Sequence, residues 1–112
     1  MIHQDCIFCK IVAGQISTPK IYETDDLIVI KDRAPRALIH YLIIPKKHIK
    51  NLQSTIESDQ NLLGSMLLAT QKLSKTLPES QEFRLVSNNG SSVGQTVFHL
   101  HFHFLAGQQL SE

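Results

Sequence analysis

Three histidines alternate with apolar residues near the end of the 112-residue chain, in the segment His99-Leu100-His101-Phe102-His103. Because side chains on a β-strand alternate between its two faces, this pattern predicts three imidazoles on one face. The apolar residues between and beside them are expected to point into a core: Phe98, Leu100, Phe102 and Phe104. Imidazole titrates near neutral pH, so it can attack phosphorus, move a proton or bind a metal. The segment therefore fits a catalytic nucleophile, a three-histidine metal centre or a plain polar face.

A loop rich in hydrogen-bond donors leads into these histidines. It covers residues 88–96 and contains Gly90 and Gly94 together with two serines. Glycine lets the backbone approach an anion closely, and consecutive N–H groups can form a nest that binds it. No Gly-Lys-Ser/Thr sequence is present, so this is not a Walker loop. Taken alone it is also compatible with a long hairpin connection, but next to the histidines it favours phosphate binding.

The elements that must position these residues include two helices of unequal length. Apolar residues recur at helical spacing over about residues 5–13, which predicts a short helix that ends at Gly14. A longer amphipathic helix is predicted over about residues 58–77, just before Pro78. Its expected apolar face consists of Leu62, Leu63, Met66, Leu67, Thr70, Leu73 and Leu77.

Five segments have the composition of strands. They cover residues 21–23, 27–31, 39–44, 83–87 and 97–105, and the first two are expected to form a hairpin. Strands outnumber helices and hairpins dominate. The predicted fold class is therefore α+β, with a five-stranded antiparallel sheet, one long helix and one short helix.

Length and composition limit the classes of protein to consider. A chain of 112 residues is expected to form a single domain over residues 1–112. Hydrophobic residues make up 42% and charged residues 19%, which is typical of a globular protein. The net charge of +1 gives no general attraction to nucleic acid polymers or membranes. No stretch approaches the roughly 20 apolar residues of a membrane span, and the first six residues lack a signal-peptide pattern. We therefore expect a cytoplasmic protein.

The end of the chain resembles the signature of the histidine-triad (HIT) family, H-φ-H-φ-H-φ-φ with φ apolar, in residues 94–105 (GQTVFHLHFHFL). Residues 6–11 (CIFCKI) and 40–49 (HYLIIPKKHI) resemble its Hint-type branch of nucleoside phosphoramidases. The likeness extends over about residues 6–109. It implies a HIT-like fold and hydrolysis of a bond at the α-phosphorus of a purine nucleotide derivative, with no cofactor for the chemistry.

The resemblance implies catalytic roles for four residues. His101 would be the nucleophile that forms a nucleotidyl-histidine intermediate, and His103 and His40 would orient it in a hydrogen-bonded relay. Thr96, where the family often has serine, would contact the phosphate or the leaving group. The chemistry of imidazole agrees, because a neutral ring with a pKa of about 6.5 is a good nucleophile near pH 7. Positioned acid–base neighbours typically contribute about 10²–10⁴ in rate.

Further positions would bind the nucleotide. The resemblance assigns the phosphate to Asn88 and Gly94, and the ribose hydroxyls to Asp32, a common task of a carboxylate. Walls for the base would come from Ile7, Phe8, Ile11, Ile30 and Leu42. For these apolar side chains, a plain core position is the alternative interpretation.

The two cysteines, Cys6 and Cys9, form a C-x-x-C pair whose side chains would share one face of the short helix. In a reducing compartment this spacing indicates metal or redox chemistry, and a structural zinc site needs two more ligands. Some bacterial members of the family bind zinc at the positions of Cys6, Cys9, His48 and His99, so the resemblance implies a structural zinc ion here. Two free thiols and a redox pair are the alternatives.

Three functions follow from these features. A nucleoside phosphoramidase is favoured, and the alternatives are a nucleotide-binding module without turnover and a three-histidine metallohydrolase. His103 stands where the family's transferase branch has glutamine, which favours hydrolysis. A P–N or acyl-phosphate bond is expected rather than a polyphosphate, because no arginine is evident near the loop. The nearest basic residues are Arg84, Lys46 and Lys47. The family pairs two sheets edge to edge, so a homodimer is expected.

Overall fold

The structure, a computed structural model, describes residues 5–112. Its helices and strands are, in order, α1 (Ile7–Val12), β1 (Tyr22–Glu23), β2 (Leu27–Lys31), β3 (Ile39–Pro45), α2 (Gln60–Ser74), β4 (Phe83–Val86) and β5 (Phe102–Ala106). Short 3₁₀ turns lie between them: η1 (Leu52–Ser54), η2 (Glu57–Asp59), η3 (Pro78–Ser80) and η4 (Ser91–Val93). The expected lack of a signal peptide rests mainly on residues 1–4, which lie outside the described residues. Within residues 5–112 no helix combines the length and apolar character that crossing a membrane requires.

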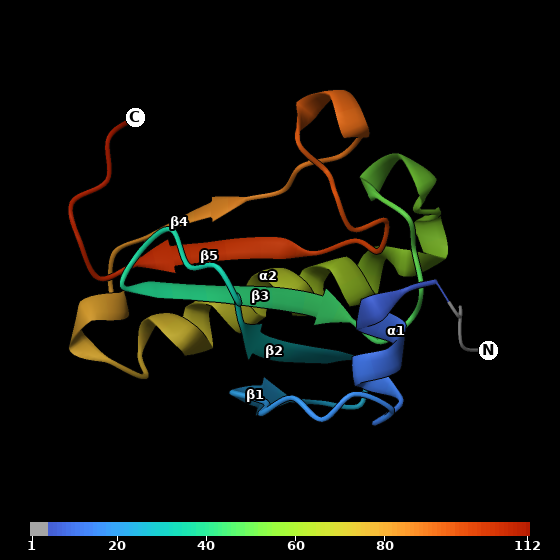
Figure 1. The fold of residues 1–112 in the computed structure, drawn as a ribbon, viewed down its shortest axis with the longest axis horizontal. Coiled ribbons are helices and arrows are strands. Elements are labelled where there is room, and N and C mark those ends of the chain that lie inside the picture. The colour runs from blue at the N-terminus through green and yellow to red at the C-terminus, as the bar shows by residue number, and fades with distance from the viewer. Residues whose placement is uncertain (1–4) are drawn as a thin grey trace.

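The five strands form one antiparallel sheet in the order β1-β2-β3-β5-β4 (Figure 1). The predicted α+β class, with its antiparallel sheet, one long helix and one short helix, is confirmed. β3 and β5 are neighbours at the centre, and their register pairs Leu42 with His103 and His40 with Leu105. Opposite and diagonal side chains in such a ladder share a face, so His40 and His103 meet on one side of the central strands.

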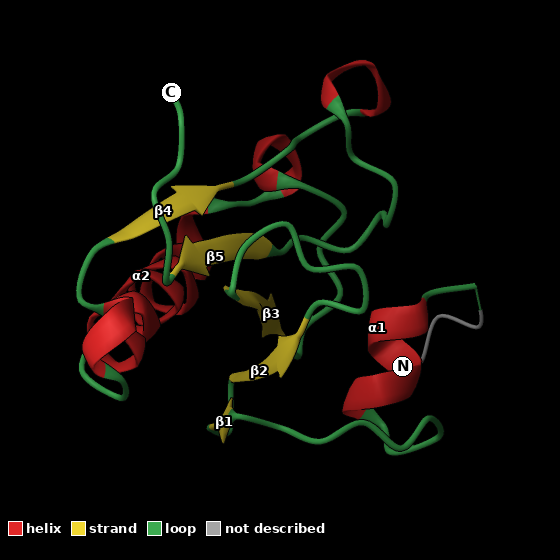
Figure 2. Cartoon of the chain, turned by 60° about the vertical axis from the view of Figure 1, so that its left-hand side comes forward, coloured by secondary structure: helices red, strands yellow, loops and turns green. Residues whose placement is uncertain are grey.

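Helices cover both faces of the sheet, α2 one face and α1 the other (Figure 2). Strands β2 and β3 are buried on both sides, so their alternate residues supply two separate cores. The core on the α2 side includes Leu27, Val29, Ile39, Tyr41, Ile43, Phe102 and Phe104. The core on the α1 side includes Ile28, Ile30, Leu42 and Ile44. Because Leu42 pairs with His103, the catalytic candidates lie on the side of the short helix.

The long helix is shorter than the sequence predicts. It spans Gln60–Ser74 and follows η2, where the buried Asp59 carboxylate pairs with the Lys47 ammonium at 2.6 Å. Its buried residues are Met66, Ala69, Thr70 and Leu73; the sequence placed all of these but Ala69 on the apolar face. Leu67 and Leu77 were expected there too, but they are 53% and 41% exposed. Leu67 is on the outer side of the helix, and Leu77 lies beyond its end.

The last strand begins at Phe102 and not at residue 97, which corrects the predicted placement of two histidines. Residues 97–101 bend away from the ladder, and the Leu100 N–H donates to the Ile49 carbonyl (2.6 Å) instead of to a strand partner. Phe98 is 45% exposed and does not point into the core, whereas the other expected core residues of this segment are buried. The three imidazoles therefore do not line up along one strand, and each takes its direction from its own hydrogen bonds.

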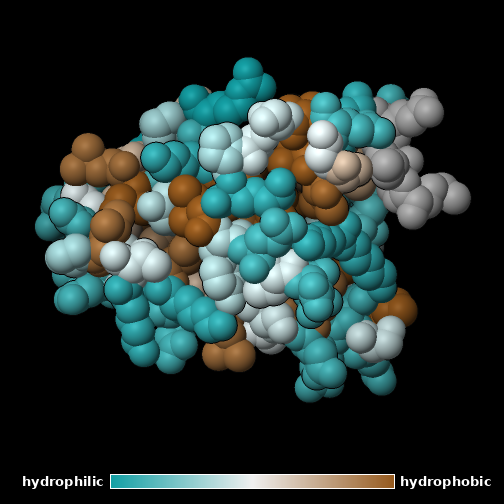
Figure 3. Space-filling view, turned by 90° about the horizontal axis from the view of Figure 1, so that it is seen from below, coloured by the Kyte–Doolittle hydropathy of each residue, from teal (hydrophilic) through white to brown (hydrophobic). Residues whose placement is uncertain are grey.

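The surface seen from below in Figure 1 is mainly hydrophilic, with separate hydrophobic patches among the polar side chains (Figure 3). Elsewhere on the described surface, Leu67 and Leu68 of α2 are 53% and 62% exposed and Leu38, in the loop before β3, is 78% exposed. Lys46, which follows β3, is paired with Glu23 at 2.8 Å. The two adjacent lysines Lys46 and Lys47 thus each have a carboxylate partner within the chain.

Candidate active site

A cleft of about 990 Å³ opens beside α1, between the end of β2 and the loop that leads into β5. All but one of the predicted catalytic and nucleotide-binding residues line it: Ile7, Phe8, Ile11, Ile30, Asp32, Leu42, Asn88, Gly94, Thr96, His101 and His103. The exception is His40, which is buried behind the lining and contacts His103. A second hollow of about 450 Å³ lies over Cys6 and His48 and reaches neither His101 nor His103. The larger cleft is therefore the candidate active site.

His101 is held in one tautomer by the backbone. Its Nδ1 lies 2.8 Å from the His99 carbonyl oxygen, and a carbonyl can only accept, so Nδ1 carries the proton. The lone pair of the neutral ring is then on Nε2. Burial lowers the pKa of His101, and the His99 carbonyl and the Asp32 carboxylate oppose that shift only in part. The ring is consequently neutral near pH 7 and has the electronic form that a nucleophile requires.

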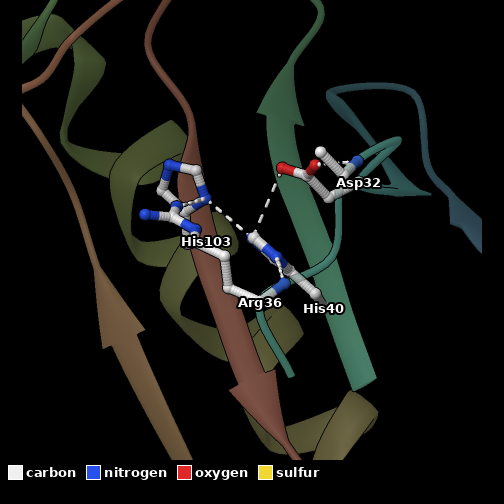
Figure 4. A network of polar contacts seen from close by, with 5 residues as sticks. Asp32, Arg36, His40 and His103 are labelled. Carbon is white, nitrogen blue, oxygen red and sulfur yellow. Dashed lines mark hydrogen bonds and ion pairs between the residues drawn. The ribbon is translucent and has the colours of Figure 1, made fainter. Parts of the chain in front are cut away.

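A chain of hydrogen bonds that runs through His40 orients His103 (Figure 4). The Arg36 backbone N–H donates to His40 Nδ1 (3.1 Å), so the proton of neutral His40 is on Nε2. His40 Nε2 lies 2.9 Å from His103 Nδ1 and 3.4 Å from Asp32 Oδ2. When His40 donates to His103, the proton of neutral His103 is on Nε2. The cleft is thus lined by one ring with a lone pair on Nε2, His101, and one with an N–H at the same atom, His103.

The electrostatics keep this cluster uncharged. Burial lowers the pKa of His103 to about 4, assisted by the charges that His101, His40 and Arg36 would place beside it, while Asp32 opposes the shift. Burial also lowers the pKa of His40, again with Asp32 in opposition. A protonated His103 could no longer accept at Nδ1 from His40. The hydrogen-bonded arrangement therefore belongs to the neutral rings.

The donor loop is fixed by a buried glutamine that sequence reasoning did not single out. The Gln95 side chain accepts from the Gly90 N–H (2.9 Å) and donates to the Lys50 carbonyl (2.8 Å). Gly94 has a φ of +98°, which favours glycine, and a side chain there would meet the Asn88 amide at 3.8 Å. The sequence offered one weak signal for Gln95, a polar residue inside a glycine-rich loop. Its contacts depend on tertiary structure and could not be predicted.

The apolar candidates satisfy both interpretations offered by the sequence. Ile7, Phe8 and Ile11 from α1 pack with Ile30 and Leu42 of the sheet in one buried cluster, and the same side chains line the cleft. Phe8 also meets the His101 ring edge-on, with centroids 5.1 Å apart. They are core residues with one edge turned toward the cleft.

Asp32 lies at the mouth of the cleft with its carboxylate partly satisfied. Oδ1 accepts from the Ala34 N–H (2.8 Å), and Oδ2 is 3.4 Å from His40 Nε2. The side chain is 20% exposed, so the carboxylate can still accept hydrogen bonds from a ligand in the cleft. This is the chemistry that the predicted contact with ribose hydroxyls requires.

Three basic residues of the cleft were missed by the sequence interpretation: Lys31, Arg33 and Arg36. The Arg36 guanidinium Nη2 lies 3.3 Å from His103 Nδ1 (Figure 4). The expectation that no arginine lies near the loop of residues 88–96 is therefore wrong, since Arg33 and Arg36 line the same cleft as Asn88 and Gly94. The loop between β2 and β3 folds back beside β5, which proximity in sequence to the donor loop could not reveal. The sequence did offer a signal: Lys31 and Arg33 flank the candidate Asp32, and Arg36 stands shortly before the candidate His40.

A second cluster gathers the four predicted metal ligands. Cys6 Sγ lies 3.1 Å and Cys9 Sγ 3.4 Å from His99 Nδ1, and His48 Nδ1 lies 3.2 Å from both Cys9 Sγ and His99 Nδ1. Tetrahedral zinc with two sulfur and two nitrogen ligands has ligand–ligand distances of about 3.3–3.8 Å. Three of the four residues are buried. The donor set and its spacing fit a structural zinc ion.

His99 is oriented for that cluster by its other nitrogen. Its Nε2 lies 2.7 Å from the Pro45 carbonyl and so carries the proton, which leaves the Nδ1 lone pair facing the cysteines. His99, His101 and His103 do not converge on one point. Among residues 5–112, the groups of three or more potential ligands are the Cys/His cluster and Asp32-His40-His103. The three-histidine metal centre considered from the sequence is therefore not assembled.

The fold and the cleft define an α+β protein whose candidate reactive groups are histidines of the last strand and of the segment before it. A family model described as scavenger mRNA decapping enzyme C-term binding matches residues 5–112. An uncharacterized HIT-like protein of Synechocystis sp. is 44% identical over 108 residues, which cover 96% of this chain and 95% of the relative. The chain belongs to the histidine-triad family, as its sequence predicted.

Solved structures agree over nearly the whole length. A histidine triad protein from Clostridium difficile has a TM-score of 0.94 at 38% identity and covers 100% of this chain and 98% of its own. A HIT family hydrolase from Clostridium thermocellum has a TM-score of 0.93 at 39% identity, over 98% of this chain and 96% of its own. The predicted HIT-like fold is thereby confirmed.

Proposed function

We propose that the cleft binds a purine nucleotide derivative and that His101 hydrolyses the bond at its α-phosphorus, with P–N bonds as the preferred substrates. The observation that carries the proposal is the tautomer of His101. The His99 carbonyl holds the proton on Nδ1, so the Nε2 lone pair is available to an electrophile. The solved HIT family hydrolase at 39% identity supports a hydrolase.

Hydrolysis proceeds in two displacements. The His101 Nε2 lone pair forms a bond to phosphorus while the P–N bond breaks, and the amine departs with a proton from the Thr96 hydroxyl or His103 Nε2–H. Water then attacks phosphorus, the bond to His101 breaks, and its electron pair returns to Nε2. One proton of the water restores the group that gave one, and the products are a nucleoside monophosphate and an amine. Asn88 and Gly94, which line the cleft, contact the phosphoryl oxygens.

The nucleoside half is assigned to the wall beside α1. Ile7, Phe8, Ile11, Ile30 and Leu42 form an apolar surface suited to a purine base. Asp32, which follows β2 and lines the same cleft, would bind the ribose hydroxyls. These contacts account for binding, and the histidines account for turnover.

We propose a structural role for zinc in the second cluster. Cys6, Cys9, His48 and His99 would hold the ion, which cross-links the start of α1 to the segments after β3 and before β5. No step of the hydrolysis uses it.

A homodimer is proposed as well. β4 is an edge strand of the sheet, and Leu67 and Leu68 of α2 are exposed apolar side chains that a second copy would cover. Light scattering at micromolar concentration should give twice the 12.6 kDa mass of one chain. A monomer under these conditions contradicts the proposal.

The decisive experiment is a screen of adenosine and guanosine 5′-phosphoramidates for release of the monophosphate, with and without a chelator. Release that persists when the chelator is added supports the proposed hydrolase. Nucleotide binding without release would identify a binding module instead. Release that stops on chelation of protein that stays folded would identify a metallohydrolase.

A further inference from the structure

The cleft carries more positive than negative charge. Its lining contains Lys31, Arg33 and Arg36 but only one carboxylate, that of Asp32. Within residues 5–112, neither arginine forms an ion pair with a carboxylate. Cations that line a cleft without a carboxylate partner favour an anionic ligand, because a cleft lined mainly by one sign of charge attracts the opposite sign. The apolar wall beside α1 offers no charge to balance them.

Arg36 is held in a contact that a ligand can replace. Its Nη2 and His40 Nε2 both approach His103 Nδ1, at 3.3 Å and 2.9 Å. A neutral imidazole nitrogen has one lone pair, so it can accept one good hydrogen bond and not two. Since His40 makes the shorter contact, the guanidinium is the partner that can leave. Arg36 is exposed overall and has the length to turn toward an anion in the cleft.

The α-phosphate already has donors in the proposed site. Two non-bridging oxygens are served there by Asn88, the Thr96 hydroxyl and His103 Nε2–H, all from residues that line the cleft. Arg36 is therefore in excess for a substrate with a single phosphate. A guanidinium binds a further phosphate well, because its fork of N–H groups matches two phosphate oxygens.

We infer that Arg36 is a specificity-determining residue that binds a second phosphate, beyond the α-phosphate, in a nucleotide ligand of this cleft. The site then accepts nucleoside di- and triphosphate groups, and leaving groups that begin with a phosphate, in addition to amines. Lys31 and Arg33 contribute long-range attraction to the same anion. This inference rests on the proposed function, since it concerns the same cleft and the same nucleotide.

The test separates binding from turnover. The affinities of AMP, ADP and ATP are measured by calorimetry in the absence of magnesium, in a His101→Ala background that prevents hydrolysis. We expect ADP and ATP to bind at least about tenfold more tightly than AMP, as for one charge-assisted contact. Arg36→Gln should abolish that difference and leave AMP nearly unchanged, and Arg36→Lys should retain part of it.

Arg84→Gln is the matched control, because Arg84 is an arginine of β4 that bonds the Ser111 carbonyl and does not line the cleft. It should keep the full difference between ATP and AMP. The inference is wrong if Arg36→Gln weakens AMP and ATP equally, or if the ratio is unchanged. If AMP and ATP both fail to bind folded protein, the proposed function is wrong and the inference falls with it.

A kinetic comparison completes the test in the chain with His101 intact. Arg36→Gln should lower kcat/KM for diadenosine triphosphate, whose leaving group is ADP, by roughly 10- to 100-fold. The value for adenosine 5′-phosphoramidate, whose leaving group is ammonia, should change by less than about threefold. Equal losses for both substrates would show that Arg36 acts on the α-phosphate or on His103 instead.

Discussion

Two histidines separated by one residue show opposite tautomers, and this difference divides the molecule into two sites. His99 donates from Nε2 to the Pro45 carbonyl and presents Nδ1 to a pair of cysteines. His101 donates from Nδ1 to the His99 carbonyl and has its lone pair on Nε2. A backbone carbonyl decides each case. The same residue type is therefore a candidate metal ligand in one region and a candidate nucleophile in the next.

Replacing His101 is the most direct test of the division into two sites. We expect His101→Ala to lower kcat by about 10⁴-fold or more, because removing a nucleophile removes the covalent route. Nucleotide affinity should change by only a few fold, and zinc content and thermal stability should stay near those of the unaltered protein. Single-turnover release of monophosphate and calorimetric binding are the two measurements. Near-normal turnover would remove His101 from the mechanism.

For the cluster of Cys6, Cys9, His48 and His99 we expect loss of stability with little loss of activity. Cys9→Ser should remove zinc and lower the melting temperature by roughly 10–20 °C, because a structural metal contributes to the stability of the fold. Activity per folded molecule should fall by less than about fivefold. Metal analysis of protein purified without added zinc is the first measurement. Less than about one-tenth of an equivalent in the unaltered protein, with both thiols titratable, rules out zinc.

The charge state of His103 gives a further test, through the pH dependence of stability. His103 has a pKa of about 4 in the folded chain, below the ordinary value near 6.5, so the unfolded chain takes up its proton first as pH falls. The contribution of His103 to stability is therefore complete above about pH 6.5 and is lost progressively between pH 6.5 and 4. Urea unfolding across this range should show a smaller pH dependence in His103→Asn. An unchanged dependence contradicts a buried neutral His103.

The smallest effect is expected in the donor loop. Thr96 lines the cleft, and Thr96→Ser keeps its hydroxyl, so kcat/KM should change by less than about threefold. Thr96→Val removes the hydroxyl at nearly the same volume and should cost about tenfold, as for one hydrogen bond. If both variants behave alike, the hydroxyl has no part in the reaction and the histidines alone supply the proton.

Local pattern was sufficient for most of the fold. The apolar repeat of residues 7–12 predicted α1, and the β-rich segments predicted the sheet, because their periods are set by neighbouring residues alone. The late start of β5 was not predictable in this way. Alternation of His and apolar residues continues upstream of Phe102, but the hydrogen bond from Leu100 to Ile49 replaces the ladder there. That partner lies in another segment of the chain.

The candidate site shows the same limit. The positions carried over from the histidine-triad signature gather around one cleft, since the signature already encodes their tertiary arrangement. Arg36 and Gln95 had no such guide. Arg36 matters because a loop returns to His103, and Gln95 matters because it reaches the Lys50 carbonyl. No periodicity or residue spacing in the sequence predicts either contact.

The bond from His101 Nδ1 to the His99 carbonyl has a consequence for how such proteins can diverge. Every amino acid supplies a main-chain carbonyl, so the nucleophile keeps its tautomer whatever side chain stands at position 99. If His99 holds the proposed zinc ion, a lineage can exchange this histidine, lose the metal and compensate with a larger apolar core under α1 without disturbing the proton on His101. The two proposed roles of residue 99 can then change separately under mutation, because metal binding uses its imidazole and the tautomer of His101 depends on its peptide carbonyl.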